Sequence, residues 1–253
     1  RMKGELATRL WGPLRAALGD DAKQVVLVPL ARLSTAPLMA SAPSDLRVWV
    51  SPSVKTLVSV LDREESTRNK ALVAAVPTGL AYTPLEYEWV QRRLVAGGLE
   101  VEALDGVAPT PNNIVKKLAG CGVFHFSGHA RYDWNDPEAS GLICVRDEDE
   151  YGNPLPSVLN VGRLWGEEGV RWVDEMVLSA CETAVSDVSE GGGEFVSLAG
   201  ALLGVGVRRV VASLWPVDDA ATAFWMDEYS RLRFEDRQAV SDAVRGATEW
   251  LRS

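Results

Sequence analysis

Histidine and cysteine are scarce in this 253-residue sequence, which contains two histidines and three cysteines. Cys121, Cys144 and Cys181 are too few for a disulfide framework and show no CxxC spacing for zinc, so we expect reduced thiols. The two histidines, His125 and His129, are four positions apart. On a strand this spacing separates them by ~13 Å, which is too far to share a metal ion. The sequence therefore predicts no metal site.

Positive charge and long apolar runs are also lacking. Lysine and arginine together number 26 against 35 aspartates and glutamates, which gives a formal net charge of −9 and disfavours direct binding of nucleic acid. No apolar run approaches the ~18 residues of a membrane span, and the N-terminus has no signal-peptide core. We expect a cytoplasmic protein that does not bind a membrane. The sequence begins at Arg1 rather than methionine, which is consistent with a piece of a longer protein.

Apolar runs of strand length alternate with longer amphipathic stretches, and 47% of the residues are hydrophobic. This order is typical of an α/β protein with helices on both faces of a mostly parallel sheet. The predicted strands are Gln24–Pro29, Arg47–Val50, Ala71–Val76, Leu99–Leu104, Val123–Ser127, Gly141–Val145, Glu175–Ala180 and Arg208–Leu214. The predicted helices are Glu5–Leu18, Leu85–Ala96, Pro111–Ala119, Glu194–Leu203, Asp219–Leu232 and Asp236–Leu251.

Two candidate chemical groups follow buried strands in the second half of the chain. His129 comes just after the strand that ends at Ser127, and Cys181 is the first residue after the apolar run Met176–Ala180. The carboxyl ends of parallel strands share one edge of a sheet, where α/β proteins bind ligands. His129 and Cys181 can therefore be neighbours although 52 positions separate them. A thiol beside an imidazole is a nucleophile–base pair, while the structural alternative for Cys181 is a buried, inert cysteine.

The remaining histidine and cysteines are predicted to be structural. His125 lies inside an apolar run, where a packed, hydrogen-bonded core histidine is the favoured interpretation. Cys144 lies within a strand pattern and Cys121 precedes one, so both are expected to be small apolar residues in or near the core. The glycines 191–193 lack the pattern of a phosphate-binding loop, so no nucleotide cofactor is predicted.

Three motifs, in this order, resemble the CHAT domain: His125-Phe-Ser-Gly-His129, Val177-Leu-Ser-Ala-Cys-Glu-Thr-Ala184 and Val210-Val-Ala-Ser-Leu-Trp-Pro-Val-Asp-Asp219. That family belongs with caspases and separases among the cysteine peptidases. The resemblance covers essentially the whole chain and implies a caspase-like three-layer α/β fold, with a mostly parallel central sheet between helices and a pseudo-repeated two-lobe arrangement. It implies one domain over 1–253, with a scaffold lobe at 1–105 and a catalytic lobe at 106–253.

The resemblance also implies roles for individual residues. His129 matches the catalytic histidine and Cys181 the nucleophile, and no cofactor is required. Gly128 matches the glycine beside that histidine, so the backbone N–H groups of Gly128 and Cys181 are expected to form the oxyanion hole. One departure is Ala130, where many family members have glycine; it removes no catalytic group.

Asp218 and Asp219 have a structural and a functional interpretation, and the two are compatible. The structural reading is that Asp218 caps a helix and Asp219 lies in its first turn, where carboxylates are favoured. The functional reading comes from the resemblance to separases, which use an acidic residue in the corresponding segment to hold a basic substrate side chain. Asp219 is the stronger of the two candidates for substrate binding.

The predicted function is therefore a cysteine endopeptidase that cleaves a protein substrate after a basic residue. The resemblance implies activation by a sensor or repeat module, in the same chain or as a separate partner. Two alternatives stay open: a catalytically silent interaction module on the same fold, and another acyl-transfer or thiol reaction on the same pair of residues.

Overall fold

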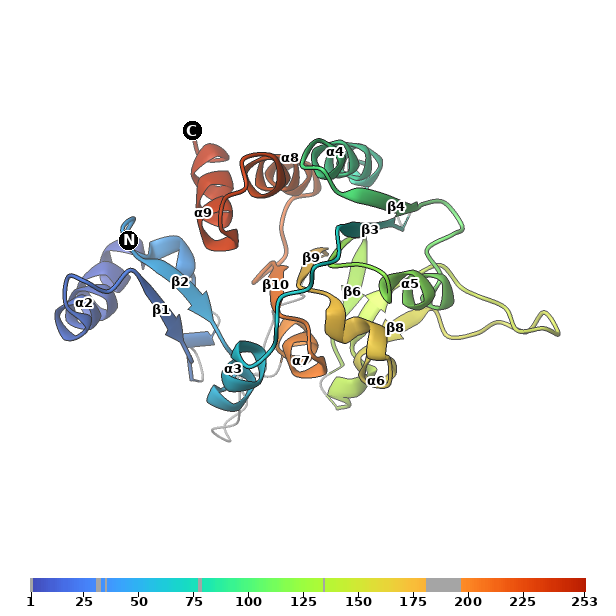
Figure 1. The fold of residues 1–253 in the computed structure, drawn as a ribbon, viewed down its shortest axis with the longest axis horizontal. Helices are drawn as coiled ribbons and strands as arrows, with labels where there is room; N and C mark the ends of the chain where they lie inside the picture. The colour runs from blue at the N-terminus through green and yellow to red at the C-terminus, as the bar shows by residue number, and fades with distance from the viewer. Residues whose placement is uncertain (1, 31–32, 35, 77–78, 134, 181–196) are drawn as a thin grey trace.

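A central sheet of five parallel strands organises the computed structural model, which describes residues 2–30, 33–34, 36–76, 79–133, 135–180 and 197–253 (Figure 1). Its strand order is β10-β9-β5-β3-β4. The strands are β3 (Lys70–Ala75), β4 (Glu100–Leu104), β5 (Val123–Ser127), β9 (Glu175–Ser179) and β10 (Arg209–Ala212). The predicted α/β class and mostly parallel sheet are confirmed.

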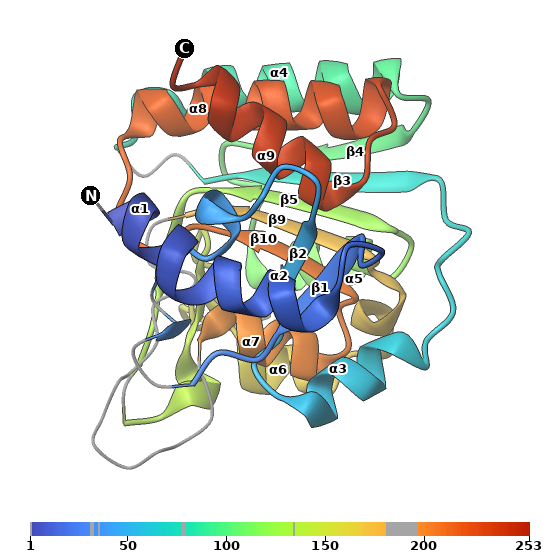
Figure 2. The same ribbon diagram turned by 90° about the vertical axis from the view of Figure 1, so that its left-hand side faces the viewer.

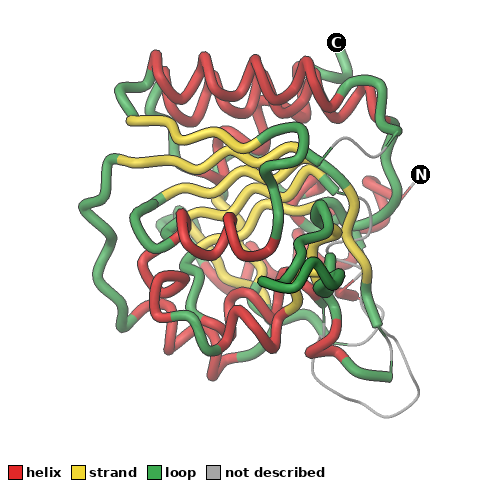
Figure 3. Tube along the Cα trace, turned by 90° about the vertical axis from the view of Figure 1, so that its right-hand side faces the viewer, coloured by secondary structure: helices red, strands yellow, loops and turns green. Residues whose placement is uncertain are grey.

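Helices cover both faces of this sheet, so the molecule has the three layers of a caspase-like fold (Figures 2 and 3). One face carries α4 (Thr83–Ala96), α8 (Asp219–Ser230) and α9 (Val240–Trp250). The opposite face carries α5 (Pro111–Leu118), α6 (Val161–Trp165) and α7 (Leu198–Val205). Each face has its own hydrophobic cluster. Side chains alternate between the two faces of a strand, and helices cover both faces of this sheet. The central strands are therefore buried on both sides, and their sequences are continuous apolar runs.

Capping residues fix where several helices begin. Thr110 accepts a hydrogen bond from the backbone N–H of Asn113 at the start of α5, and Pro111 follows as the first helical residue. Asp218 accepts a hydrogen bond from the N–H of Ala221 at the start of α8, which confirms the predicted cap. Ser197 does the same for α7.

Two smaller sheets flank the central one. Strands β1 (Gln24–Leu27) and β2 (Arg47–Val50) form a parallel pair, next to the helical segment formed by α1 (Met2–Leu6), η1 (Ala7–Trp11) and α2 (Gly12–Leu18). Strands β6 (His129–Arg131), β7 (Gly141–Ile143) and β8 (Val158–Asn160) form an antiparallel sheet. The predicted strands at 24–29 and 47–50 therefore exist but form a sheet of their own. The division into scaffold and catalytic lobes stays a prediction.

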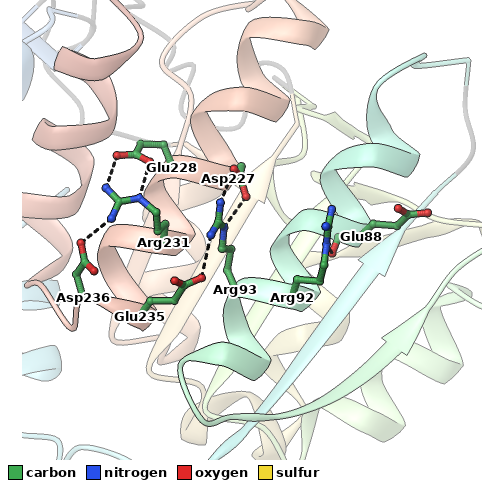
Figure 4. Close-up of polar contacts among 8 residues, drawn as sticks. All are labelled: Glu88, Arg92, Arg93, Asp227, Glu228, Arg231, Glu235 and Asp236. Carbon is green, nitrogen blue, oxygen red and sulfur yellow. Dashed lines mark hydrogen bonds and ion pairs between the residues drawn. The ribbon is translucent and has the colours of Figure 1, made fainter.

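Helix α4 is fastened to its neighbours by ion pairs (Figure 4). Arg93 makes a two-pronged contact with Asp227 of α8, with nitrogen–oxygen distances of 2.8 and 3.0 Å, and a further pair of 3.1 Å with Glu235. These carboxylates raise the pKa of Arg93 through hydrogen bonding, chiefly from Asp227. Two-pronged contacts of this kind fix orientation as well as distance, so α4 and α8 form a stiff layer on this face.

Candidate active site

His129 lies where the chain passes from the central sheet into the small antiparallel sheet. Strand β5 ends at Ser127, Gly128 makes the connection, and His129 opens β6 opposite Ile143 of β7. The histidine is half-buried. It therefore lies at the carboxyl edge of the parallel strands, as the sequence predicts, with its backbone fixed by strand pairing.

Gly128 lies at a tightly packed point of this junction. A Cβ atom there would lie 3.2 Å from the Phe126 ring and 3.3 Å from the Val76 Cβ. Both neighbours belong to the buried core, so a side chain at this position would need them to shift by a few tenths of an ångström. The glycine lets β5 turn into β6 while the core closes behind it.

Hydrogen bonds tie together the strand ends along this edge. The Val76 N–H donates to the Ser127 carbonyl and the Gly128 N–H donates to the Ser179 carbonyl, both at 3.0 Å. After β10, the Ser213 hydroxyl donates to the Ala180 carbonyl at 2.9 Å. The ends of β3, β5, β9 and β10 are thus joined in one row at the edge where His129 lies.

Cys181 lies outside the described residues, which stop at Ala180 and resume at Ser197. The pairing of β5 with β9 nevertheless bears on it. Ser127 pairs with Ser179, an offset of 52 residues, and the same offset separates His129 from Cys181 in the sequence. The strand that precedes Cys181 and the strand that precedes His129 are therefore direct neighbours in register.

The backbone N–H of Gly128 already has an acceptor. Because it donates to the Ser179 carbonyl, it would have to leave that bond before it could donate to an oxyanion. The expected oxyanion hole of Gly128 and Cys181 stays a prediction.

Asp218 and Asp219 both have structural contacts at the start of α8. Asp218 is exposed and caps the helix. Asp219 is half-buried, and its Oδ2 accepts a hydrogen bond of 2.9 Å from the backbone N–H of Tyr82, just before α4. The structural interpretation of the pair is confirmed, and substrate binding stays a prediction.

A buried carboxyl group that the sequence analysis did not single out lies behind this edge. Glu86 of α4 is 2% exposed. Its Oε1 is 2.8 Å from the Nε2 of His125, and its Oε2 accepts a hydrogen bond of 2.7 Å from the Ser179 hydroxyl. His125 is 1% exposed, which confirms the predicted hydrogen-bonded core histidine. A sequence signal existed: Glu86 shares the helical stripe of the buried residues Val90 and Leu94.

The two described cysteines are core residues, as predicted. Cys121 and Cys144 are both reduced and buried, at 0% and 5% exposure. Burial raises the pKa of both thiols, and that of Cys144 reaches about 12.

In the part of the chain that the structure describes, no group of three or more His, Cys, Asp or Glu side chains could hold a metal ion. No helix in that part is long and apolar enough to cross a lipid bilayer.

The five parallel strands between two layers of helices give the three-layer α/β arrangement of caspase-like folds, and His129 lies at the carboxyl edge of that sheet. A family model for the CHAT domain matches residues 1–253, so the chain belongs to the CHAT domain family over its whole length. This family is related to the caspase-like cysteine peptidases. No curated protein matches the sequence closely enough to count as a relative.

Proposed function

We propose that this protein is a cysteine endopeptidase in which Cys181 is the nucleophile and His129 is the acid–base group. The observation that carries the proposal is the register of the central sheet. Strands β5 and β9 are paired with the offset that separates His129 from Cys181, and His129 lies at the carboxyl edge of that pair. Membership of a family related to cysteine peptidases supports the same assignment.

The reaction follows from these two side chains. His129 takes the proton of the Cys181 thiol, the resulting thiolate attacks the scissile carbonyl carbon, and the negative charge moves to the carbonyl oxygen, where backbone N–H groups stabilise it. His129 then gives a proton to the leaving amine as the C–N bond breaks. Water attacks the resulting thioester while His129 accepts a proton from that water; the C–S bond then breaks, the acid product leaves, and the Cys181 thiolate recovers its proton from His129.

The proposed substrate is a protein cleaved after arginine or lysine. The support is the carboxyl group of Asp219, half-buried between the starts of α4 and α8, in a chain with a formal net charge of −9. A carboxylate withdrawn from water interacts strongly with a cation, and a guanidinium can meet it with two parallel hydrogen bonds. A sensor or repeat module, in cis or in trans, is proposed to activate the enzyme.

Cleavage assays on site variants test the proposal. Cys181→Ala and His129→Ala are each expected to abolish proteolysis while the circular dichroism spectrum stays that of the unmodified chain. Cys144→Ala is the matched control, because it removes a buried thiol away from the reaction and costs stability through a core cavity, with activity retained. Full peptidase activity in Cys181→Ala would refute the proposal.

A catalytically silent interaction module is the second candidate, and one observation favours it. The Gly128 N–H is occupied by the Ser179 carbonyl, whereas an oxyanion donor must be open to the substrate. Specific binding of a partner protein, together with equal inertness of the unmodified chain and Cys181→Ala toward all peptide substrates, would favour this candidate.

A further inference from the structure

Glu86 joins three elements through its two carboxyl oxygens. It belongs to the first turn of α4, its Oε1 contacts His125 of β5, and its Oε2 accepts the Ser179 hydroxyl of β9. Ser179 lies two residues before Cys181 in the sequence, and His125 lies four before His129. One side chain therefore spans the two strands that lead to the proposed nucleophile and its acid–base partner.

The contacts of Glu86 with His125 and Ser179 are buried. Glu86, His125 and Ser179 are 2%, 1% and 7% exposed, so water cannot replace a contact that is lost. A buried polar group without a hydrogen-bond partner costs free energy. Each of the three side chains is therefore held to its partners. Backbone pairing sets the spacing of β5 and β9, and Glu86 ties the first turn of α4 to both strands near their carboxyl ends.

The rest of the first turn of α4 reaches the same edge. The Thr83 hydroxyl lies 3.5 Å from the Ser127 hydroxyl, and the Tyr82 N–H donates to Asp219 at the start of α8. These contacts reach the segments that hold His129 and the proposed substrate-binding carboxyl group. At the other end of α4, Arg93 fastens the helix to α8 (Figure 4). The turn is therefore a fixed support behind the edge.

A second buried glutamate on the same face provides a contrast. Glu175, at the amino end of β9, is 1% exposed and accepts hydrogen bonds from the Tyr229 hydroxyl at 2.6 Å and from Arg233 at 2.9 Å. Burial and Glu175 together raise the pKa of Tyr229 well above its usual value. Glu175 has the chemistry and burial of Glu86, but it lies at the opposite end of the strand from the proposed active site.

We propose that Glu86 is a positioning residue for the peptidase reaction: it anchors the first turn of α4 to β5 and β9 and thereby holds in place the strand ends that lead to His129 and to the nucleophile. The proposal rests on the proposed function. Glu86 does not touch the reacting atoms and acts through His125 and Ser179. Small errors in the placement of reacting groups lower the rate steeply, whereas they leave remote substrate contacts intact.

Kinetics of two matched variants test the proposal. Glu86→Ala is expected to lower kcat by about tenfold or more while KM changes by less than about threefold. Glu175→Ala removes an equally buried carboxyl group from the same sheet face, so it is expected to lower the melting temperature but to keep kcat within about twofold of the unmodified chain. Equal kcat values for the two variants would overturn the proposal.

Rescue separates positioning from stability. Glu86→Gln is expected to restore most of the lost kcat, because glutamine has the same length and offers one acceptor and one donor to Ser179 and His125. If either alanine variant does not fold, Ser179→Ala and Tyr229→Phe form a second pair, since each removes one hydroxyl that donates to a buried glutamate. Ser179→Ala is expected to lower kcat and Tyr229→Phe is not; the reverse result would overturn the proposal.

A readout without proteolysis separates this proposal from the proposed function. The rate of Cys181 alkylation by iodoacetamide, followed by peptide mapping, reports on a thiol beside an imidazole whether or not any peptide is cleaved. Glu86→Ala is expected to slow this rate and Glu175→Ala is not. A Glu86-dependent rate in a chain that cleaves no peptide even together with its proposed activator would reject the peptidase and keep the positioning role, and identical rates in both variants would reject the positioning role.

Discussion

At the scale of single residues, the environments of the two described cysteines predict how they react. Cys121 and Cys144 are buried among apolar side chains, and burial raises the pKa of each thiol, to about 12 for Cys144. A thiol reacts as its thiolate, so both residues are expected to stay unreactive at neutral pH. Their burial assigns both cysteines to the core, and the proposed nucleophile is Cys181.

Thiol labelling checks this distinction. At pH 7.5, with the chain folded, iodoacetamide is expected to modify Cys181 while Cys121 and Cys144 stay unmodified, and all three are expected to react after denaturation. Because the pKa values of the two buried thiols are raised, their labelling in the folded chain should increase only as the pH approaches those values. Peptide mapping by mass spectrometry measures the labelling. Rapid labelling of Cys144 at pH 7.5 would contradict its described environment.

The two aspartates before and in α8 are expected to differ in their effects. Asp219→Asn removes the charge but keeps an oxygen that accepts the Tyr82 N–H. It should raise the activation free energy for cleavage after arginine by about 2 kcal/mol or more. Asp218→Asn still caps α8 and should change little, while Asp218→Ala should cost about 1 kcal/mol of stability. Cleavage profiling and thermal unfolding measure these effects. A profile dominated by aspartate or apolar P1 residues would leave both aspartates as helix-start residues only.

At the scale of elements, the small antiparallel sheet holds His129 in place. Strand β6 starts with this histidine and pairs with β7, which in turn pairs with β8. Gly141 of β7 lies so close to β8 that a Cβ atom there would overlap the Leu159 carbonyl group. The sheet therefore depends on this glycine for its close spacing.

Gly141→Ala is accordingly expected to force β7 and β8 apart and to lower the free energy of unfolding by about 2 kcal/mol or more. It should also reduce activity, because β6 loses its fixed partner. Gly204→Ala is the control: the same substitution in α7 meets no atom within 4 Å and should not destabilise the protein. Denaturant unfolding of both variants measures the difference. Equal stability would show that the small sheet can widen without cost.

Long, periodic elements could be predicted from the sequence, and short ones could not. The eight predicted strands correspond to β1, β2, β3, β4, β5, β7, β9 and β10. The predictions missed β6 and β8, because three residues are too few for an alternating pattern. They also missed α6, which has five residues, and α3 (Val54–Leu61), which buries no residue completely. Strands β6 and β8 owe their structure to pairing with β7, whereas α3 begins at a local cap, where the Ser53 hydroxyl accepts the Thr56 N–H.

Only those parts of the candidate site that follow from periodic elements or local sequence could be predicted. The position of His129 follows from a strand that ends at Ser127, which the apolar run reveals. Glu86 was missed because a glutamate in an amphipathic helix is normally exposed; its place on the stripe of Val90 and Leu94 indicates burial, but its partners His125 and Ser179 are evident only in three dimensions. The capping role of Asp218 was evident from local sequence, whereas the contact of Asp219 with Tyr82 spans 137 positions of the chain.

At the scale of the whole molecule, one central sheet connects both hydrophobic clusters, while β1 and β2 lie in a separate pair with a small cluster around Trp11. Strands paired on both sides open least often. In hydrogen exchange followed by mass spectrometry, the amides of β3, β5 and β9 are therefore expected to exchange most slowly and those of β1 and β2 faster. Equal protection of β1 and β5 would contradict this description of the core.

The most direct test of the central claim is covalent labelling of the unmodified chain by a peptidyl electrophile with arginine at P1, together with its proposed activator if one is required. We predict a single modification at Cys181, found by peptide mapping, which is lost in His129→Ala and weakened in Asp219→Asn. An electrophile with aspartate at P1 is the matched control and should react more slowly. Modification at Cys121 or Cys144, or labelling of Cys181 that does not depend on His129, would contradict a His129–Cys181 peptidase.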